Sequence, residues 1–324
     1  MKILFNGFRH SHIYGLYQKV AATPSLEIVG CIEPDAVARE DAVKNLQISF
    51  SDTDYDTWLA SDVDIVAIGN AYGDRGENII KALRAGKHVI ADKPICTSLD
   101  QLATIRQLLD ETGLQLGCML DLRFLPQVLK AREIISSGRL GQVHNVSFNG
   151  QHGLGYGSRP MWYFEKGMHG GTINDLAIHG VDLVRYISGQ EFAAVNAART
   201  WNAFADKEPE FGDCATFMAQ LENGASVLAD ISYSGPSGVG AMPTYWEFRF
   251  WCDKGMLSFC YFDKCVTLYE SGVQGEQRIE CDPVTEDYLT EFLDQIQTGK
   301  RSMTENVLAS SETVLKIQKA ADEG

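Results

Sequence analysis

The chain has 324 residues, of which 45% are hydrophobic and 22% charged, an ordinary globular composition long enough for two domains. The formal net charge of −15 argues against nucleic acid or an anionic membrane as partner, because no basic face is left over. The N-terminus enters a predicted strand rather than a signal peptide, no apolar run has the length of a membrane span, and the eight cysteines form no CxxC pair. These features together predict a cytoplasmic protein with reduced thiols.

The first part of the chain alternates short apolar runs with helical patterns. Ser98 and Gln101 form a capping box that starts one helix, and Gly113 ends it. This alternation predicts a Rossmann-type domain over residues 1–121, a parallel sheet with helices on both faces. The expected strands are residues 2–6, 26–33, 63–69, 88–91 and 114–120.

The second part of the chain has a different pattern. Helices are expected over 126–137 and 171–187, and again over 286–298 and 304–322. Between these two pairs, strands recur with hairpin turns at Asn223-Gly224, Asp253-Lys254-Gly255 and Ser271-Gly272, and residues 234–244 read as a glycine- and proline-rich loop. We expect an α+β domain over 122–324, with a large, mainly antiparallel open sheet.

Aromatic residues crowd two strands of that sheet. Strand alternation is expected to place aromatic side chains on both faces, and only one face can pack on the domain's own helices. An apolar face left in water predicts a homodimer or homotetramer. The residues concerned are Phe248, Phe250, Phe259, Tyr261 and Phe262.

The opening turn resembles a dinucleotide-binding turn with most of its glycines missing. The G-x-G-x-x-G pattern begins at Gly7, but Arg9 and His12 occupy its other two glycine positions. Glu33 ends the next strand, where an acid would bind the adenosine ribose, and the helix start near His12 offers N–H groups to a pyrophosphate. Taken alone, Glu33 could equally be a solvated loop acid before Pro34.

Two further stretches carry chemically useful side chains. Lys93 follows a strand in HVIADKPICTS, at the sheet edge where ligands bind in such domains, and could move a proton or hold a substrate oxygen. Asp175 and His179 lie four residues apart on a predicted α-helix and so share a face that Asp182 extends, as an acid–base pair would require. The alternatives are a surface lysine in an ordinary turn and an exposed polar pair.

These stretches together resemble the glucose–fructose oxidoreductase / inositol dehydrogenase / MocA (Gfo/Idh/MocA) family. AGKHVIADKP is similar to that family's AGKHVxxEKP motif, with Asp92 in place of the usual glutamate, and GGTINDLAIHGVDL is similar to its GGGxxxDxxxHxxD motif. The closing helices resemble those of the family too. Where the family usually has T-P-x-x-x-H, this chain has Asn70-Ala71-Tyr72-Gly73-Asp74-Arg75.

The resemblance implies an oxidoreductase that uses NAD, or less readily NADP, on a sugar, inositol or sugar acid. It implies that Lys93, Asp175 and His179 are catalytic. The expected cofactor-binding residues are Gly7, Phe8, Arg9, His10, Ser11, His12, Glu33, Asn70, Ala71, Arg75, Lys93 and Pro94. The expected substrate-binding residues are Lys93, Arg123, Arg159, Trp162, Tyr163, Lys166, His169, Asp175 and His179, whose positive charges favour an acidic or phosphorylated sugar.

Two other functions remain open from the sequence. A non-catalytic relative that senses a nucleotide or sugar would explain the altered glycine turn but not the catalytic trio. A metal-dependent isomerase or hydrolase could use histidines from distant segments, but it would leave Lys93 without a role, so no metal is expected. The histidines in question are His10, His12, His152, His169 and His179.

Overall fold

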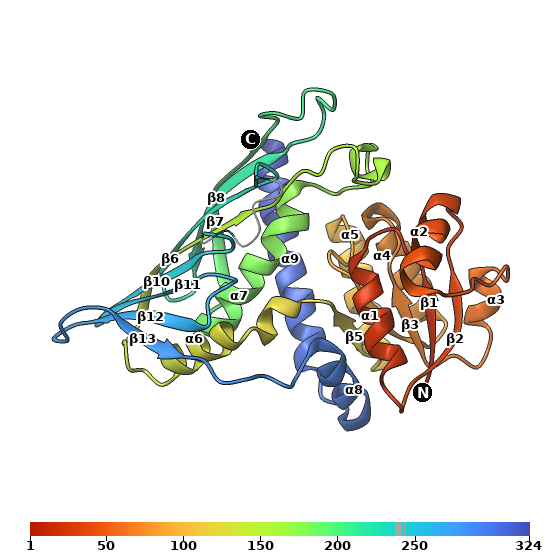
Figure 1. Ribbon diagram of the computed structural model, residues 1–324, viewed down its shortest axis with the longest axis horizontal. Helices are drawn as coiled ribbons and strands as arrows, with labels where there is room; N and C mark the ends of the chain where they lie inside the picture. The colour runs from red at the N-terminus through yellow and green to blue at the C-terminus, as the bar shows by residue number, and fades with distance from the viewer. Residues whose placement is uncertain (237–241, 243) are drawn as a thin grey trace. The chain divides into compact units, whose positions relative to one another are not determined.

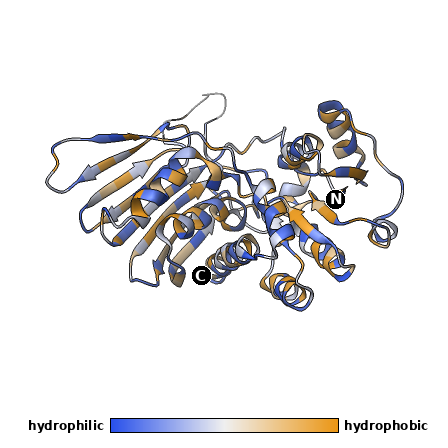
Figure 2. Cartoon of the chain, turned by 90° about the horizontal axis from the view of Figure 1, so that it is seen from below, coloured by the Kyte–Doolittle hydropathy of each residue, from blue (hydrophilic) through white to orange (hydrophobic). Residues whose placement is uncertain are grey.

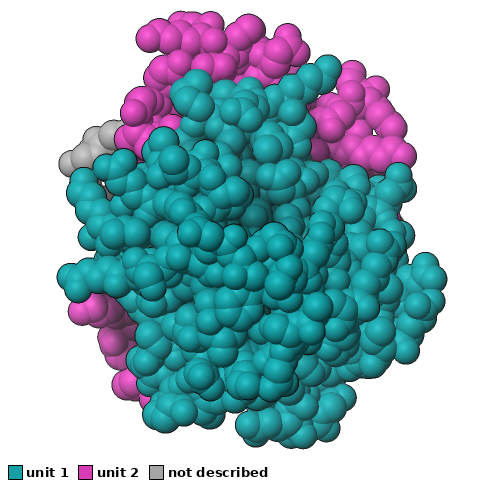
Figure 3. Space-filling view, turned by 90° about the vertical axis from the view of Figure 1, so that its right-hand side faces the viewer, with its two compact units in different colours: residues 1–119, 160–170, 287–312 teal, residues 120–159, 171–286, 313–324 magenta. Residues whose placement is uncertain are grey.

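The computed structural model describes residues 1–236, 242 and 244–324, so most of the loop expected at 234–244 lies outside the described residues. The chain forms two compact units, coloured separately in Figure 3. Unit 1 comprises residues 1–119, 160–170 and 287–312, and unit 2 comprises residues 120–159, 171–286 and 313–324. Two segments from beyond residue 121, namely 160–170 and 287–312, therefore pack with the N-terminal unit.

Unit 1 is built on a five-stranded parallel sheet of order β2-β1-β3-β4-β5. Its central strands are buried, as runs without alternation require. Figure 2 shows these strands in the colour of hydrophobic residues. The expected Rossmann-type arrangement is confirmed. The strands are β1 (Lys2–Asn6), β2 (Glu27–Ile32), β3 (Ile65–Ile68), β4 (His88–Ala91) and β5 (Leu116–Cys118).

Local signals fix where the helices of unit 1 begin and end. Ser98 Oγ accepts the Gln101 amide at 3.2 Å, and Gly113 adopts φ 71° at the other end of that helix, as predicted. The helices are α1 (His12–Ala21), α2 (Ala36–Leu46), α3 (Tyr55–Leu59), α4 (Tyr72–Arg84), α5 (Leu99–Thr112), the short turn η2 (Met161–Phe164), α8 (Tyr288–Thr298) and the first half of α9 (Ser302–Glu323).

Unit 2 contains an eight-stranded sheet of order β13-β12-β11-β10-β6-β9-β8-β7. It is antiparallel except where β6 pairs with β9, and the three predicted hairpin turns all join neighbouring strands. The strands are β6 (Val143–Gln151), β7 (Phe192–Trp201), β8 (Cys214–Leu221), β9 (Ser226–Ser232), β10 (Phe248–Cys252), β11 (Gly255–Phe259), β12 (Cys265–Glu270) and β13 (Gln277–Glu280).

Helices cover one face of this sheet (Figure 1). Gly180 on one of these helices packs against the sheet, because a Cβ there would lie 2.0 Å from the Phe148 ring on β6. Glycine lets the helix backbone come into contact with the sheet. The helices are η1 (Asp121–Phe124), α6 (Pro126–Ser136), the π-helical turn η3 (Ile173–Ala177), α7 (Ile178–Ser188) and the end of α9.

The five aromatic residues expected to occupy both faces of this sheet do not do so. Phe248 and Phe250 are two apart and Phe259 pairs with Phe248 across the strands, so all three lie on the buried face. Tyr261 and Phe262 follow the end of β11 and are not in the sheet. The outer face instead carries other partly apolar side chains, namely Met218, Leu228, Trp251 and Tyr269.

Candidate active site

The turn after β1 requires a glycine at its first position. Gly7 has φ 90°, and a Cβ on it would lie 2.5 Å from the backbone nitrogen of Asn70. Gly69 is equally constrained, because its Cβ would lie 2.4 Å from the Gly7 carbonyl oxygen. The two turns at the ends of β1 and β3 therefore touch backbone to backbone, so this close approach survives the loss of the other motif glycines.

Glu33 holds the same turn from the other side. Its carboxylate accepts the amide N–H of Phe8 at 2.5 Å and that of Asp35 at 2.8 Å, and the residue is 1% exposed. Burial raises the pKa of Glu33, and the hydrogen bonds from the two backbone amides oppose that rise. Arg9 lies 3.6 Å from the more exposed Asp35 carboxylate. Thus the predicted ribose-binding acid also organises the glycine turn.

The residues around this turn fit a dinucleotide. The carbonyl oxygen of the Asn70 side chain is buried and has no hydrogen-bond partner among the residues that the structure describes, so an acceptor is left for a ligand donor. The first turn of α1 begins at His12, and the first amide groups of a helix have no partner inside it. Such groups favour a phosphate.

Lys93 follows β4 and is 3% exposed. Its ammonium lies 5.9 Å from the centre of the Tyr72 ring. The neighbouring Arg75 is fully buried and donates to Asp92 at 2.8 Å and to the carbonyl oxygens of Asn70 and Lys93. One guanidinium thus ties the end of β3 to the end of β4. This fixes the backbone that carries Lys93.

The Asp92 carboxylate also contacts two histidines. His10 Nδ1 lies 2.8 Å and His12 Nδ1 3.2 Å from its carboxylate oxygens. Burial alone would raise the pKa of Asp92, but Arg75, His10 and His12 hold it well below its usual range. Burial lowers the pKa of His10 to about 4. The side chains of His10, His12 and Asp92 could reach one metal ion. However, the positive charge of Arg75, which is paired with the Asp92 carboxylate, opposes a second cation there.

The aromatic residues expected to line a substrate pocket are buried within unit 1. Trp162 and Tyr163 are each 1% exposed and pack on Tyr72. The two tyrosine hydroxyls lie 2.6 Å apart, and the Trp162 ring N–H donates to the Arg9 carbonyl. His169 is buried against the same two tyrosine rings, whereas Lys166 is exposed. The segment 160–170 is thereby anchored beside the glycine turn.

Asp175 and His179 lie in unit 2 and are both buried. Asp175 belongs to the π-helical turn η3 and His179 to α7, so the geometry assumed for one continuous α-helix does not hold there. A π-helical turn has i→i+5 hydrogen bonds and often marks a functional site. The Tyr233 hydroxyl donates to the Asp175 carboxylate, and the His179 ring lies 5.7 Å from that of Trp246.

Other predicted residues of unit 2 are engaged within the unit. Arg123 forms a two-pronged ion pair with Asp182, with both N···O distances 2.5 Å. Arg159 donates to the carbonyl oxygens of Gly153 and Leu154, and its guanidinium lies over the Tyr233 ring. Their roles in substrate binding stay predictions.

Sequence reasoning missed two members of these clusters. Tyr233 follows β9 with no motif to mark it, and only the fold brings its hydroxyl to Asp175. Asp92 was noted only as a substitution for glutamate, although it is the centre of the cluster with Arg75 and His10. The signal was present in the spacing, because the ends of neighbouring parallel strands meet at one edge.

A Rossmann-type sheet with a glycine turn, joined to an open-sheet unit that carries an Asp–His pair, defines the class of nucleotide-dependent oxidoreductases. Residues 8–119 match the family description "Oxidoreductase family, NAD-binding Rossmann fold", and residues 128–258 match "GFO/IDH/MocA C-terminal domain". The chain belongs to the Gfo/Idh/MocA family, as the motifs indicated.

Several of the relatives are named as sugar or inositol dehydrogenases. The chain is 27% identical to levoglucosan dehydrogenase of Pseudarthrobacter phenanthrenivorans, over 61% of this chain and 52% of that protein. It is also 27% identical to scyllo-inositol 2-dehydrogenase (NAD(+)) of Bacillus subtilis, over 68% of this chain and 63% of that protein. The matches thus span between half and two thirds of these relatives. A crystal structure from Erwinia carotovora atroseptica shares the fold, with a TM-score of 0.89 at 24% identity, over 99% of this chain and 98% of that chain.

Proposed function

We propose that this protein is a nicotinamide-dependent dehydrogenase or reductase. It transfers a hydride between the cofactor and a hydroxyl- or keto-bearing carbon of a sugar, inositol or sugar acid. The observation that carries the proposal is the presence of all three catalytic positions of the family. Lys93 lies at the end of β4 in unit 1, and Asp175 with His179 lies at the η3–α7 junction in unit 2.

The three side chains divide the proton chemistry. An alcohol gives up its hydride readily only as its proton leaves, so a base must reach that hydroxyl. A neutral imidazole is an available base near neutral pH, which assigns this role to His179. Asp175, held by Tyr233, positions the substrate. The role proposed for Lys93 is to hold a substrate oxygen through its ammonium group. When bound, the nicotinamide supplies the hydride acceptor or donor.

The preferred cofactor is NAD rather than NADP. Gly7, Arg9 and the first turn of α1 would hold the phosphates, with Phe8, His10, Ser11, His12, Asn70, Ala71, Arg75 and Pro94 completing the cradle. Glu33 and Asp35 place two carboxyl groups at the end of β2, where a 2′-phosphate would meet like charge. The B. subtilis relative, by its name, uses NAD(+). Titrations in which NADP(H) binds more tightly than NAD(H) would overturn this preference.

The direct test of the function is a hydride-transfer assay. Purified protein is mixed with NAD⁺ and, separately, with inositols, levoglucosan, D-xylose and sugar acids, and the appearance of reduced nicotinamide is followed. Turnover with at least one polyol supports the proposal. Tight nicotinamide binding with no turnover on any of them would instead favour the sensor.

The proposal includes the cellular location and the assembly of the protein. We place it in the cytoplasm, a reducing compartment that suits a chain whose eight cysteines are thiols. In the described part of the chain, no helix combines the length and apolar character needed to cross a membrane. A homodimer or homotetramer through the outer face of the unit 2 sheet is the proposed assembly.

A further inference from the structure

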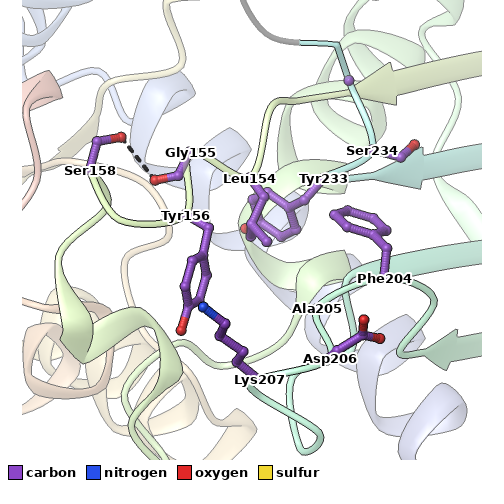
Figure 4. A pocket seen from close by; sticks show the side chains of 11 residues that line it. Leu154, Gly155, Tyr156, Ser158, Phe204, Ala205, Asp206, Lys207, Tyr233 and Ser234 are labelled. Carbon is purple, nitrogen blue, oxygen red and sulfur yellow. Dashed lines mark hydrogen bonds between the residues drawn. The ribbon is translucent and has the colours of Figure 1, made fainter.

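Unit 2 contains a pocket of about 680 Å³ (Figure 4). This volume lies in the range of small-molecule sites. Three segments line it: the loop after β6, the loop after β7 and the residues that follow β9. The lining residues are Leu154, Gly155, Tyr156, Ser158, Phe204, Ala205, Asp206, Lys207, Tyr233, Ser234 and Gly235.

The rim of this pocket is preorganised by a buried carboxylate. Asp213 is 0% exposed and accepts the amide N–H groups of Ala203, Phe204 and Ala205 at 2.8, 2.9 and 2.7 Å. The Asn202 side chain donates to three carbonyl oxygens of the same loop. A loop held by six hydrogen bonds keeps its shape before a ligand arrives, which lowers the entropy cost of binding.

Tyr233 connects the pocket to the candidate active site. It lines the pocket, its amide donates to the Asp213 carbonyl at 2.8 Å, and its hydroxyl donates to Asp175. The Tyr233 side chain therefore contacts both the pocket and the Asp175 carboxylate. The pocket is formed by unit 2 residues alone.

The chemistry of the lining suits a neutral sugar ring. Phe204 is 39% exposed, so its ring can face the apolar C–H face of a pyranose. Tyr156 is 44% exposed, and the Lys207 ammonium lies 5.4 Å from the centre of its ring. The hydroxyls of Ser158 and Ser234 and the side chains of Asp206 and Lys207 offer hydrogen bonds around them. Charges of both signs occur side by side, so the lining does not select an anion.

We propose that this pocket is a distal subsite for a second sugar unit, so that the substrate is a disaccharide or other glycoside rather than a free monosaccharide. The inference rests on the proposed function for the reacting end of the substrate. It concerns only how the rest of that substrate is held.

Calorimetric titration of the full chain with maltose, cellobiose and lactose, and with glucose and galactose, tests the subsite. We expect at least one disaccharide to bind at least about tenfold more tightly than its component monosaccharides. Phe204→Ala and Tyr156→Ala should remove most of that advantage. Phe262→Ala, which truncates an aromatic side chain 48% exposed and outside the pocket, should leave it intact.

No disaccharide advantage, or one that survives both pocket variants, would overturn the subsite. Because these titrations measure binding, they separate the two proposals. Turnover of monosaccharides without a disaccharide advantage leaves the oxidoreductase standing and removes the subsite. A Phe204-dependent disaccharide advantage in a protein that transfers no hydride supports the subsite and contradicts the oxidoreductase.

Discussion

His10 Nδ1 lies 2.8 Å from a carboxylate oxygen of the fully buried Asp92. The same oxygen accepts a hydrogen bond from Arg75 at 2.8 Å. Burial lowers the pKa of His10 to about 4, while Arg75, His10 and His12 outweigh the effect of burial on the pKa of Asp92 and hold it well below its usual value. The cluster beside Lys93 is therefore built for a neutral His10 and an ionised Asp92.

The free energy of unfolding should fall as the pH drops from about 6.5 to about 4. Over this range the unfolded chain protonates His10, whose ordinary pKa is 6.5, while the folded protein does so only near its lowered pKa of about 4. The His10 contribution is present above that range and amounts to roughly 3 kcal/mol at most. Asp92 adds little change there, because its contribution is lost only at lower pH.

Urea denaturation at several pH values measures this dependence. His10→Asn, which keeps a side-chain donor for Asp92, should flatten the slope between pH 6.5 and 4. His144→Asn, at a histidine side chain 53% exposed, should leave the slope as it is. Equal slopes in both variants would show that the buried cluster is not the origin of the pH dependence of the free energy of unfolding.

Gly7→Ala should destabilise the protein more than an equivalent change elsewhere. Gly86 also has a positive φ, 76° against 90°, but a Cβ there meets nothing within 4 Å. Both variants incur the left-handed backbone cost of roughly 1–2 kcal/mol. Gly7→Ala adds the contact with Asn70, roughly 1–3 kcal/mol more, and should weaken NAD binding. Denaturation and NAD titration of the two variants give the difference, and similar values would refute the close approach.

Lys93→Ala should keep the fold and lose at least about a hundredfold in turnover, the usual size of an acid–base contribution. Because Lys93 is 3% exposed, Lys93→Met serves as a companion that preserves the buried stem. Steady-state kinetics and thermal melts measure both effects. Lys81→Ala, at a lysine side chain half exposed on α4, is the control. Near-normal turnover of both Lys93 variants would make it an ordinary turn lysine.

His179→Ala should remove the acid-side limb of the pH–rate profile. If His179 accepts the substrate proton, that limb has an apparent pKa near that of an imidazole. Lys93 is the competitor for the role, because a lysine side chain can also act as a general base. The profiles of His179→Ala and Lys93→Met decide between them. A limb that survives in the first variant and vanishes in the second assigns the base to Lys93.

The protein should be a dimer or tetramer at micromolar concentration. The register places Met218 beside Leu228, and Trp251, Met256 and Tyr269 in a row across the outer face of the unit 2 sheet. An apolar face of this kind favours burial against a second copy. Light scattering should give a multiple of 35.8 kDa.

Leu228→Lys, at a residue 52% exposed, should shift that assembly towards the monomer, while Val37→Lys on α2, 69% exposed, should not. A monomer mass for the unmodified protein would contradict the assembly.

The sequence by itself determined the features that depend on near neighbours in the chain. Uninterrupted apolar runs predicted the strands of unit 1, because strands buried on both faces need them. Ser98, Gln101 and Gly113 marked a helix through caps formed within a few residues. The Lys93-Pro94 and Asp175–His179 motifs pointed to the family, and the matches confirmed it.

Only the tertiary structure decided which of these residues share contacts. Glu33 reaches back to the Phe8 amide, Arg75 joins two strand ends through Asp92, and Tyr233 meets Asp175. No local pattern encodes such contacts, since each depends on how distant segments pack. The same holds for Phe259, whose face is set by its register with Phe248 on the neighbouring strand. A shift of one residue in that register would turn its side chain to the opposite face, and strand register is fixed by packing and turns rather than by composition.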